Sequence, residues 1–202
     1  ERKIHPGEYE LNPAMAPADI LAKLVSGRVV LHSVTIPEGY TMVQIADVLA
    51  QQQITDRAEF LRLVRDKVFI KTLGIVADTL EGYLYPDTYR FPRPIAAKEV
   101  IRTMVEQLNQ VFTPEWQARA NDIHLTKHEV LTLASVIEKE TGAGDERPQI
   151  SSVFHNRLKL GMRLQSDPTA VYRLDPKGTP VKTVLRSHLA AATPHNTYRI
   201  NG

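Results

Sequence analysis

Two glutamates, Glu138 and Glu140, stand two positions apart in the stretch LTLASVIEKETGAGDER, residues 131–147. Carboxyl groups are common general acids and bases, so this stretch is a candidate for proton-transfer chemistry. At 100° per residue, apolar residues such as Leu133 and Ile137 share one broad face of a helix, and the two glutamates flank that face on opposite sides. The spacing alone therefore leaves the choice between the two glutamates open.

The position along the predicted helix favours the second glutamate. Gly142 and Gly144 indicate a helix stop just beyond it, close to the negative end of the helix macrodipole. A carboxyl group that apolar neighbours partly desolvate at that end suits a general acid, and Glu140 is nearer to it than Glu138. The alternative is a solvated helix end without a catalytic role, which is the more common situation for a Glu-Lys-Glu sequence.

Other chemistries lack their motifs in this sequence. His124 and His128 are four residues apart, but the sequence HLTKH lacks the glutamate of a zinc-binding HExxH helix, so we predict no metal site. No glycine-rich phosphate loop, Ser-His-Asp order or dinucleotide fingerprint is present, so we predict no cofactor. The absence of cysteine excludes thiolate catalysis, disulfides and cysteine-ligated zinc.

The composition is typical of a folded globular chain, with 43% hydrophobic and 24% charged residues. A formal net charge of +2, without a long run of one sign, argues against a nucleic-acid partner. No apolar run approaches the ~20 residues that a membrane span needs. The first residue is Glu1 rather than methionine, so we expect a fragment that lacks any N-terminal membrane anchor.

The N-terminal part of the chain alternates between strand and helix patterns. The expected elements are strands at 7–11 and 28–36 and helices at 17–26, 42–52 and 57–66. Thr41 and Asp56 are predicted to cap the second and third of these helices. The order of strand, Pro-Glu-Gly turn, Thr-capped helix and further helix resembles the LysM peptidoglycan-binding module, although no closing strand is evident.

The C-terminal part is predicted to be mainly helical. A tyrosine-rich strand-turn unit at 79–92 precedes it, and helices are expected at 96–111, 128–141 and 145–161. Phe112-Thr113-Pro114 is predicted to end the first of these helices. The expected fold class is therefore α+β, with a small LysM-like strand-helix-helix subdomain followed by a mainly helical domain that has a few short strands.

Five motifs occur along the chain in the order EGYLYPDTYRF, ASVIEKET, SSVFHNRL, GMRLQSDPTAVY and ATPHNTYRI. Together they resemble the YceG-like family of endolytic murein transglycosylases, from about residue 34 onward. His195 departs from the tyrosine that family members often carry there. The resemblance implies an N-terminal region at 1–76, with the LysM-like subdomain at about 33–70, and a catalytic domain at 77–202. The family continues past this terminus, so we expect the catalytic domain to be incomplete here.

The resemblance also implies the roles of individual residues. The catalytic glutamate of the family corresponds to Glu140, which acts as acid and then as base while the 6-hydroxyl of the muramic sugar closes a 1,6-anhydro ring. The candidates for glycan binding are Glu81, Tyr85, Asn156, Gln165, Asp167, Thr169, Asn196 and Tyr198. Structural alternatives stay open for them, such as a helix N-cap at Asp167 before Pro168 and core or loop packing for the tyrosines.

The implied partner is the peptidoglycan glycan strand, with peptidoglycan synthases as further candidates. The implied location is the periplasmic face of the inner membrane, held by an anchor outside this chain. Two other functions remain alternatives, a non-catalytic glycan-binding module and a muramidase with two carboxyl groups. A pyridoxal-phosphate lyase, a label that members of the family have carried, lacks a recognisable phosphate cup in this sequence.

Overall fold

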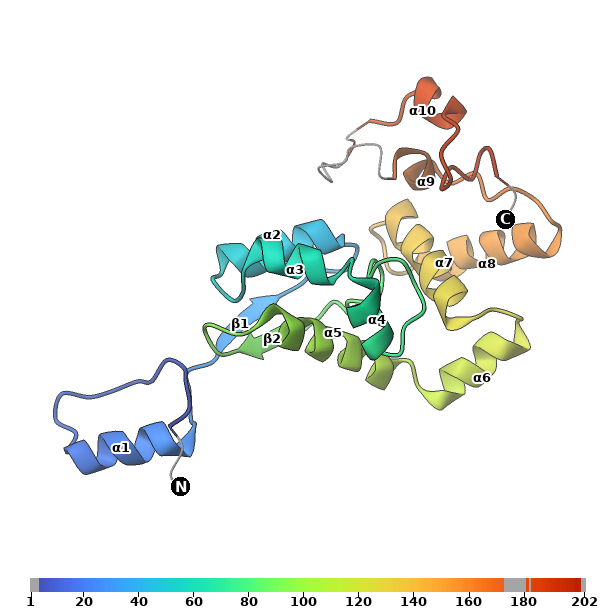
Figure 1. Cartoon of the computed structure of the whole chain (residues 1–202). Helices are drawn as coiled ribbons and strands as arrows, with labels where there is room; N and C mark the ends of the chain where they lie inside the picture. The colour runs from blue at the N-terminus through green and yellow to red at the C-terminus, as the bar shows by residue number, and fades with distance from the viewer. Residues whose placement is uncertain (1–3, 173–180, 182, 201–202) are drawn as a thin grey trace. The chain divides into compact units, whose positions relative to one another are not determined.

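The computed structural model describes residues 4–172, 181 and 183–200. The chain divides into two compact units, Glu1–Val111 and Phe112–Gly202. Helices dominate both units, and the strands of the described ranges form a single two-stranded sheet (Figure 1). The predicted α+β class is therefore confirmed. The predicted domain boundary between residues 76 and 77 falls inside the first unit.

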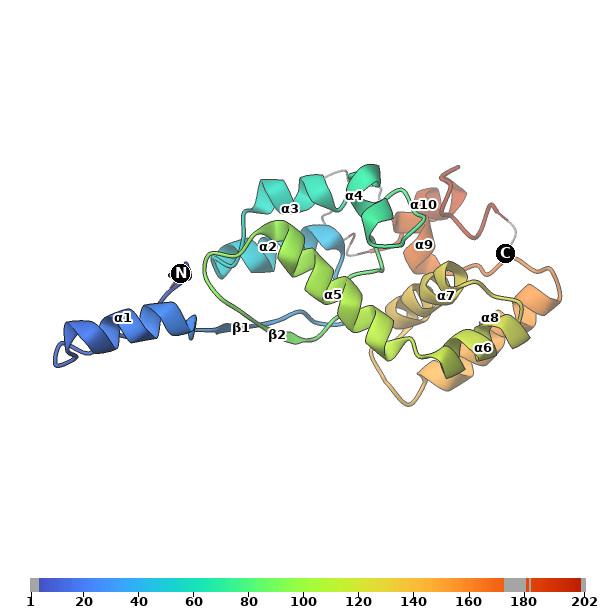
Figure 2. The ribbon, with the colours of Figure 1, turned by 60° about the horizontal axis from the view of Figure 1, so that its bottom comes forward.

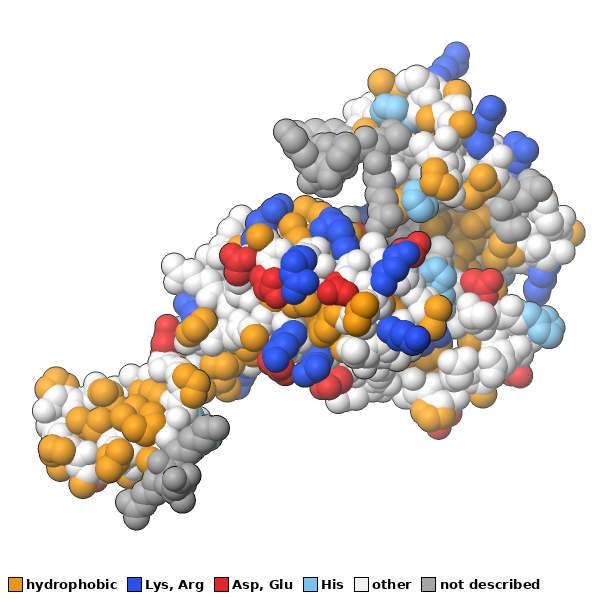
Figure 3. Space-filling view, in the orientation of Figure 1, with side chains coloured by type: hydrophobic (Ala, Val, Ile, Leu, Met, Phe, Trp, Pro, Cys, Tyr) orange, Lys and Arg blue, Asp and Glu red, His pale blue; other side chains and the backbone are white. Residues whose placement is uncertain are grey.

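The first unit begins with an irregular segment and helix α1, Pro17–Ser26, which ends at Gly27 in the left-handed conformation with φ 66°. The strand predicted at 7–11 is wrong, because these residues have no ladder partner and a lone strand is unstable. Tyr9 instead donates a hydrogen bond to the His5 carbonyl at 2.7 Å. Figure 3 shows hydrophobic side chains on the surface of α1. Leu21 of this helix is 46% exposed.

The sheet joins β1, His32–Thr35, to β2, Thr88–Phe91. The strands are antiparallel, and the register places Val34 opposite Tyr89. Both of these side chains are buried, so one face of the sheet packs on the core while the alternate residues face outward. Figure 2 shows the helices that follow β1 in this unit on one side of the sheet. β2 therefore provides the strand beside β1 that was not evident from the sequence of the strand-helix-helix unit.

Two capped helices follow β1. α2, Met42–Gln51, starts at a capping box in which Thr41 accepts the Gln44 N–H and the Gln44 side chain accepts the Thr41 N–H. α3, Arg57–Leu63, starts at Asp56, whose carboxylate accepts the Glu59 N–H at 2.7 Å. The two predicted N-caps are therefore confirmed, and the buried stripe of α2 comprises Met42, Ile45, Ala46 and Leu49.

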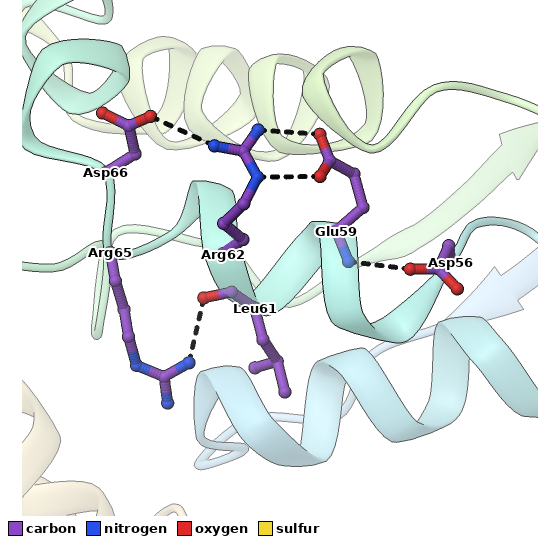
Figure 4. Close-up of polar contacts among 6 residues, drawn as sticks. All are labelled: Asp56, Glu59, Leu61, Arg62, Arg65 and Asp66. Atoms are coloured by element: carbon purple, nitrogen blue, oxygen red, sulfur yellow. Dashed lines mark hydrogen bonds and ion pairs between the residues drawn. The ribbon is translucent and has the colours of Figure 1, made fainter.

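A third short helix, α4, Lys67–Thr72, was not predicted. Asp66 caps it and also accepts a bond from Arg62 at 3.4 Å. Figure 4 shows that Arg62 binds both carboxylate oxygens of Glu59 as well, at 2.8 and 2.9 Å. This exposed network lowers the pKa of Glu59, chiefly through its hydrogen bonds to Arg62.

Helix α5, Ala97–Val111, completes the core of the first unit. Its buried residues are Ala97, Val100, Ile101, Met104, Val105 and Leu108. The segment before β2 is fastened to these helices, because Leu80 donates its N–H to the Val64 carbonyl at 2.9 Å and Tyr85 donates to the Met104 carbonyl at 3.3 Å. Residues on both sides of position 76 therefore share one core.

The regular elements in the described part of the second unit are all helices. Its elements are α6, Pro114–Asp122; α7, Lys127–Glu140; α8, Arg147–Lys159; α9, Asp167–Val171; and α10, Arg186–Ala190. Pro114 begins α6 rather than only ending α5, because proline is tolerated in the first turn and Thr113 caps the helix. The predicted helices at 128–141 and 145–161 are confirmed as α7 and α8.

A small hydrophobic cluster holds the second unit together. It contains Leu133 and Val136 of α7, Phe154 of α8, and Leu164 of the segment that follows α8. α7 also contacts α6 and α9, so it is the central element of this unit (Figures 1 and 2). Across the ranges that the structure describes, no helix is long and apolar enough to cross a membrane.

Candidate active site

The end of α7 places its two glutamates in different surroundings. Glu138 is half-buried and forms an ion pair with Arg147 at the start of α8, with 2.9 Å between Nη2 and Oε2. Glu140 is the last residue of the helix and is exposed. The expected partial desolvation of Glu140 is therefore wrong, because the helix ends there and Thr141 already has an extended backbone.

Glu140 is held by a hydroxyl group instead. Ser166, directly before α9, donates a hydrogen bond from Oγ to Oε1 of Glu140. Ser166 is only 1% exposed, so its hydroxyl contacts the carboxylate from the protein side. The sequence did not single out Ser166. Its position between Gln165 and Asp167 in the LQSDPT motif was the available signal.

Two threonines hold the backbone around Ser166. Thr197 accepts the Ser166 N–H at 2.9 Å, and Thr169 donates to the Ser166 carbonyl at 2.6 Å. The two threonine hydroxyls lie 2.8 Å apart, and Thr169 also accepts the Thr197 N–H at 3.1 Å. Thr169 was a predicted glycan ligand, but it is buried in this network. Thr197 is a further site residue that the sequence did not single out.

Asp167 and Tyr198 form a second polar pair in the same unit. The Tyr198 hydroxyl donates to Asp167 Oδ1 at 2.5 Å. This hydrogen bond is the main reason why the pKa of Tyr198 is raised to about 12; burial and the charges of Asp167 and Glu140 also raise it, while Arg157 lowers it. Three charged groups therefore act on one phenol.

The structure does not support an N-cap at Asp167. Ser166 occupies the cap position of α9, Asp167 is the first helical residue, and no side-chain cap bond forms there. The pattern of an acidic residue before Pro168 indicated the helix start correctly but placed it one residue late. The Asp167 carboxylate is exposed and bound by Tyr198 instead.

Asn196 stabilises the surrounding loop. It is fully buried, and its amide nitrogen donates to the carbonyl oxygens of His188, Leu189 and Ala191 at 2.7–3.2 Å. Its Oδ1 accepts the Tyr198 N–H at 3.0 Å. A buried side chain with these partners positions the segment that carries Thr197 and Tyr198.

The remaining predicted glycan ligands lie in different environments. Gln165 and Asn156 have exposed side chains in the second unit, with Gln165 in the left-handed conformation at φ 52°. Glu81 and Tyr85 belong to the first unit. There Glu81 accepts the N–H of Met42 at 2.9 Å, and the Tyr85 carbonyl accepts the Tyr89 hydroxyl at 2.6 Å.

The second unit thus brings together the Glu140 carboxyl group, the buried Thr169, the half-buried Thr197, the buried Ser166 and the Asp167–Tyr198 pair. Within the described ranges, no cluster of three or more histidine and acidic side chains could hold a metal ion. A carboxyl group that is open to solvent, with one oxygen bound by a buried hydroxyl, can deliver a proton to an external substrate and take one back.

Comparison with known proteins gives consistent matches over almost the whole chain. A model of the YceG-like family matches residues 1–202. A protein named endolytic murein transglycosylase from Bacillus subtilis (strain 168) is 32% identical over 212 residues, which cover 97% of this chain and 58% of that protein. A protein of the same name from Streptococcus pneumoniae serotype 2 (strain D39 / NCTC 7466) is 32% identical over 224 residues, covering 96% and 40%.

A solved structure described as a yceG-like protein from Listeria monocytogenes has a TM-score of 0.76 and 35% sequence identity to this chain. The match covers 96% of this chain and 68% of that one. The chain spans between 40% and 58% of the length of the two named transglycosylases.

Proposed function

The chain belongs to the YceG-like family, and we propose that it is the transglycosylase part of an endolytic lytic transglycosylase that cleaves peptidoglycan. The observation that carries the proposal is the position of Glu140, whose exposed carboxyl group lies at the end of α7 and accepts a hydrogen bond from Ser166 at Oε1. The relatives named endolytic murein transglycosylase support the reaction class.

The proposed reaction needs one carboxyl group. Glu140 donates its proton to the oxygen between N-acetylmuramic acid and N-acetylglucosamine, and the bond from that oxygen to C1 of the muramic sugar breaks. The Glu140 carboxylate then removes the proton of the muramic 6-hydroxyl, whose oxygen bonds to C1 and closes a 1,6-anhydro ring. Glu140 ends the cycle protonated, and no water is consumed. The nucleophile is already attached to the substrate, so proximity replaces a bound water.

The charges around Glu140 support a cationic transition state. Asp167 is exposed, carries a carboxylate and lies within reach of Tyr198, whose pKa responds to both Asp167 and Glu140. Negative charge of this kind stabilises an oxocarbenium-like sugar. We assign the exposed side chains of Gln165 and Asn156, together with Asp167 and Tyr198, to glycan binding. Thr169 and Asn196 hold the backbone next to these side chains through hydrogen bonds to Ser166 and Tyr198.

The first unit is proposed to bind glycan as well. β1, α2 and α3 follow one another along the chain, and β2 pairs with β1 after the further helix α4. This arrangement supports the LysM-like interpretation, and Glu81 and Tyr85 are the proposed contacts. A peptidoglycan substrate implies an extracytoplasmic location. We extend the proposal to the periplasmic face of the inner membrane and to peptidoglycan synthases as candidate partners.

The decisive experiment is digestion of purified sacculi followed by mass spectrometry of the released muropeptides. We expect 1,6-anhydro-muramic ends, and we expect Glu140→Gln to release none. Borohydride provides a second readout, because it converts a reducing muramic end to muramitol and leaves an anhydro end unchanged. Abundant muramitol in the wild-type digest would reject the transglycosylase.

Asp167 separates the proposal from a muramidase with two carboxyl groups. In the proposed reaction Asp167 only positions and stabilises, so Asp167→Asn should reduce turnover much less than Glu140→Gln. In a hydrolase in which Asp167 is the nucleophile or base, both substitutions should reduce turnover by several orders of magnitude, and the products should carry reducing ends.

A further inference from the structure

The contact between Ser166 and Glu140 has no counterpart at Glu138, where an arginine binds the carboxylate. We propose that Ser166 is the positioning residue for Glu140, and that its hydroxyl reserves Oε1 so that Oε2 alone exchanges protons with the glycan. The inference rests on the proposed function and adds to it which oxygen acts and what fixes it.

The direction of the hydrogen bonds around Ser166 follows from counting protons. Thr169 has one hydroxyl proton, which it donates to the Ser166 carbonyl. In the short contact between the threonine hydroxyls, Thr197 must therefore be the donor and Thr169 the acceptor. Thr197 Oγ1 in turn accepts the Ser166 N–H, which closes a ring of three hydrogen bonds through the Ser166 backbone.

This ring fixes the backbone of Ser166 on both sides of its Cα. The N–H and the carbonyl of the same residue are each bound by a threonine hydroxyl, and Thr169 and Ser166 are almost fully buried. A side chain on a fixed backbone loses little further entropy when it forms its own hydrogen bond. The Ser166 hydroxyl is thus prepared to donate toward Glu140 before any substrate binds.

The hydrogen bond from Ser166 makes the two carboxylate oxygens of Glu140 different from each other, because it involves Oε1 only. An ionised carboxylate only accepts hydrogen bonds, so in that state Ser166 must donate to Oε1. When Glu140 is protonated, the proton on Oε2 leaves the Ser166 bond intact. The same oxygen, Oε2, can therefore give its proton to the glycosidic oxygen and later accept the proton of the muramic 6-hydroxyl. No rotation of the carboxyl group is needed between the two steps.

The burial of Ser166 distinguishes its positioning role from a role in substrate binding. Ser166 is 1% exposed and cannot contact a glycan strand, whereas Gln165 and Asp167 on either side are exposed. Removing the Ser166 hydroxyl should consequently change the chemical step and leave the affinity for substrate unchanged.

The kinetic test compares Ser166→Ala with the wild-type protein on a soluble glycan oligomer of defined length. We expect kcat to fall about 10- to 100-fold, as for the loss of one hydrogen bond to a charged group, while KM changes by less than about twofold. Ser166→Thr keeps a hydroxyl and should recover part of the lost kcat. Ser152→Ala is the matched control, because the exposed Ser152 donates only to the Gln149 carbonyl within α8.

A second variant keeps the test valid if Ser166→Ala fails to fold. Thr197→Val removes the hydroxyl that accepts the Ser166 N–H and leaves Ser166 and Glu140 in place. It should lower kcat in the same direction with KM unchanged. An unchanged kcat in whichever of these variants folds, or a loss expressed in KM alone, would overturn the positioning role.

A stability measurement tests the contact without any substrate. The free energies of unfolding of Ser166→Ala, Glu140→Ala and the double variant form a cycle, in which a nonzero coupling reports the hydrogen bond. Additive effects would refute the contact even if the protein is a transglycosylase. Conversely, reducing ends from the wild-type protein would reject the proposed function and leave the measured coupling intact.

Discussion

At the scale of single residues, the partner of each glutamate at the end of α7 decides what that glutamate can do. Glu138 is bound by Arg147, and the side chains of this pair are only 25% and 35% exposed. Glu140 is exposed and held by a neutral hydroxyl. Arg147 contacts both carboxylate oxygens of Glu138, whereas Ser166 binds only Oε1 of Glu140.

Replacing the two glutamates in turn tests this difference. Glu140→Gln should abolish glycan cleavage with little change in folding, because it removes the transferable proton and keeps the size of the side chain. Glu138→Gln should retain most activity and cost about 1 kcal/mol or less of stability, since it weakens one partly exposed ion pair. Turnover of sacculi and urea unfolding of both variants provide the measurements. An inactive Glu138→Gln beside an active Glu140→Gln would reverse the assignment.

The Tyr198 hydroxyl should lose its proton at a higher pH than an ordinary tyrosine. Its hydrogen bond to Asp167, together with burial and nearby negative charge, raises its pKa from 10.0 to about 12. Because the folded-state pKa is above the unfolded value, the stabilisation from this group is complete below pH 10 and is lost as the pH rises through about 12.

Absorbance of tyrosinate at alkaline pH checks the expected value. The difference between wild-type and Tyr198→Phe curves should have a midpoint near pH 12, and Asp167→Asn should move that midpoint toward 10 because it removes the charge. A difference curve centred on pH 10 in the wild-type protein would mean that the Asp167–Tyr198 bond does not persist in solution.

At the scale of elements, α7 connects the start of the second unit to the site. Its N-terminus is fixed by a capping box, in which Thr126 accepts the Glu129 N–H and Glu129 accepts the Thr126 N–H. Leu133 and Val136 then fix its middle in the hydrophobic cluster. Glu140 follows one turn later, so the position of its backbone depends on both anchors.

Thr126→Ala should therefore destabilise the protein by about 1 kcal/mol, the usual cost of losing an N-cap. Thr132→Ala is the control, because exposed Thr132 lies inside α7 and only donates to the His128 carbonyl. Alanine has the higher helix propensity there, so this variant should be neutral or slightly more stable. Thermal unfolding of both variants gives the comparison, and equal losses would show that the capping box contributes nothing specific.

Periodic elements were predictable from the sequence, and elements defined by distant or short-range contacts were not. α5, α7 and α8 have helical spacing of apolar residues and were expected within one or two residues. α4 was missed because it has only six residues. β2 was recognisable as extended chain, but its pairing with β1 depends on residues 53 positions away and leaves no local signal.

Some residues of the candidate site were likewise predictable from the sequence, and others were not. Glu140, Asp167 and Tyr198 were accessible through their motifs, because large polar side chains in recognisable stretches indicate chemistry. Ser166 and Thr197 were not, since small hydroxyl residues acquire their role only when the fold brings 166 and 197 together. The burial of Asn196 likewise follows from the loop that closes around it.

At the scale of the whole molecule, the two units predict where the chain can be divided. The core of the first unit joins Val34 and Leu49 to Tyr89 and Met104, so it includes residues on both sides of position 76. The second unit has its own cluster around Leu133 and Phe154. The boundary between the two units lies at 111/112, whereas a cut near 76 would divide the core of the first unit.

Two truncations distinguish these boundaries. Removal of residues 1–68 should expose the apolar side chains of β2 and α5 and increase binding of the dye ANS. Removal of residues 1–111 should leave the second unit without such a surface, and it should bind less dye. Dye fluorescence and limited proteolysis measure both. A truncation at 68 that is protease-resistant and binds no dye would favour the boundary at 76/77 instead.

The register of the sheet has a consequence during synthesis. Thr35 of β1 pairs with Thr88 of β2, 53 positions later. At about 5–20 residues per second, a ribosome needs about 3–10 seconds to make that stretch. During this interval α2 and α3 can form from local contacts, but Val34 and Ile36, both buried in the finished protein, have no strand beside them. The nascent chain therefore exposes the apolar side chains of Val34 and Ile36 until Phe91 has left the ribosome and the sheet can close.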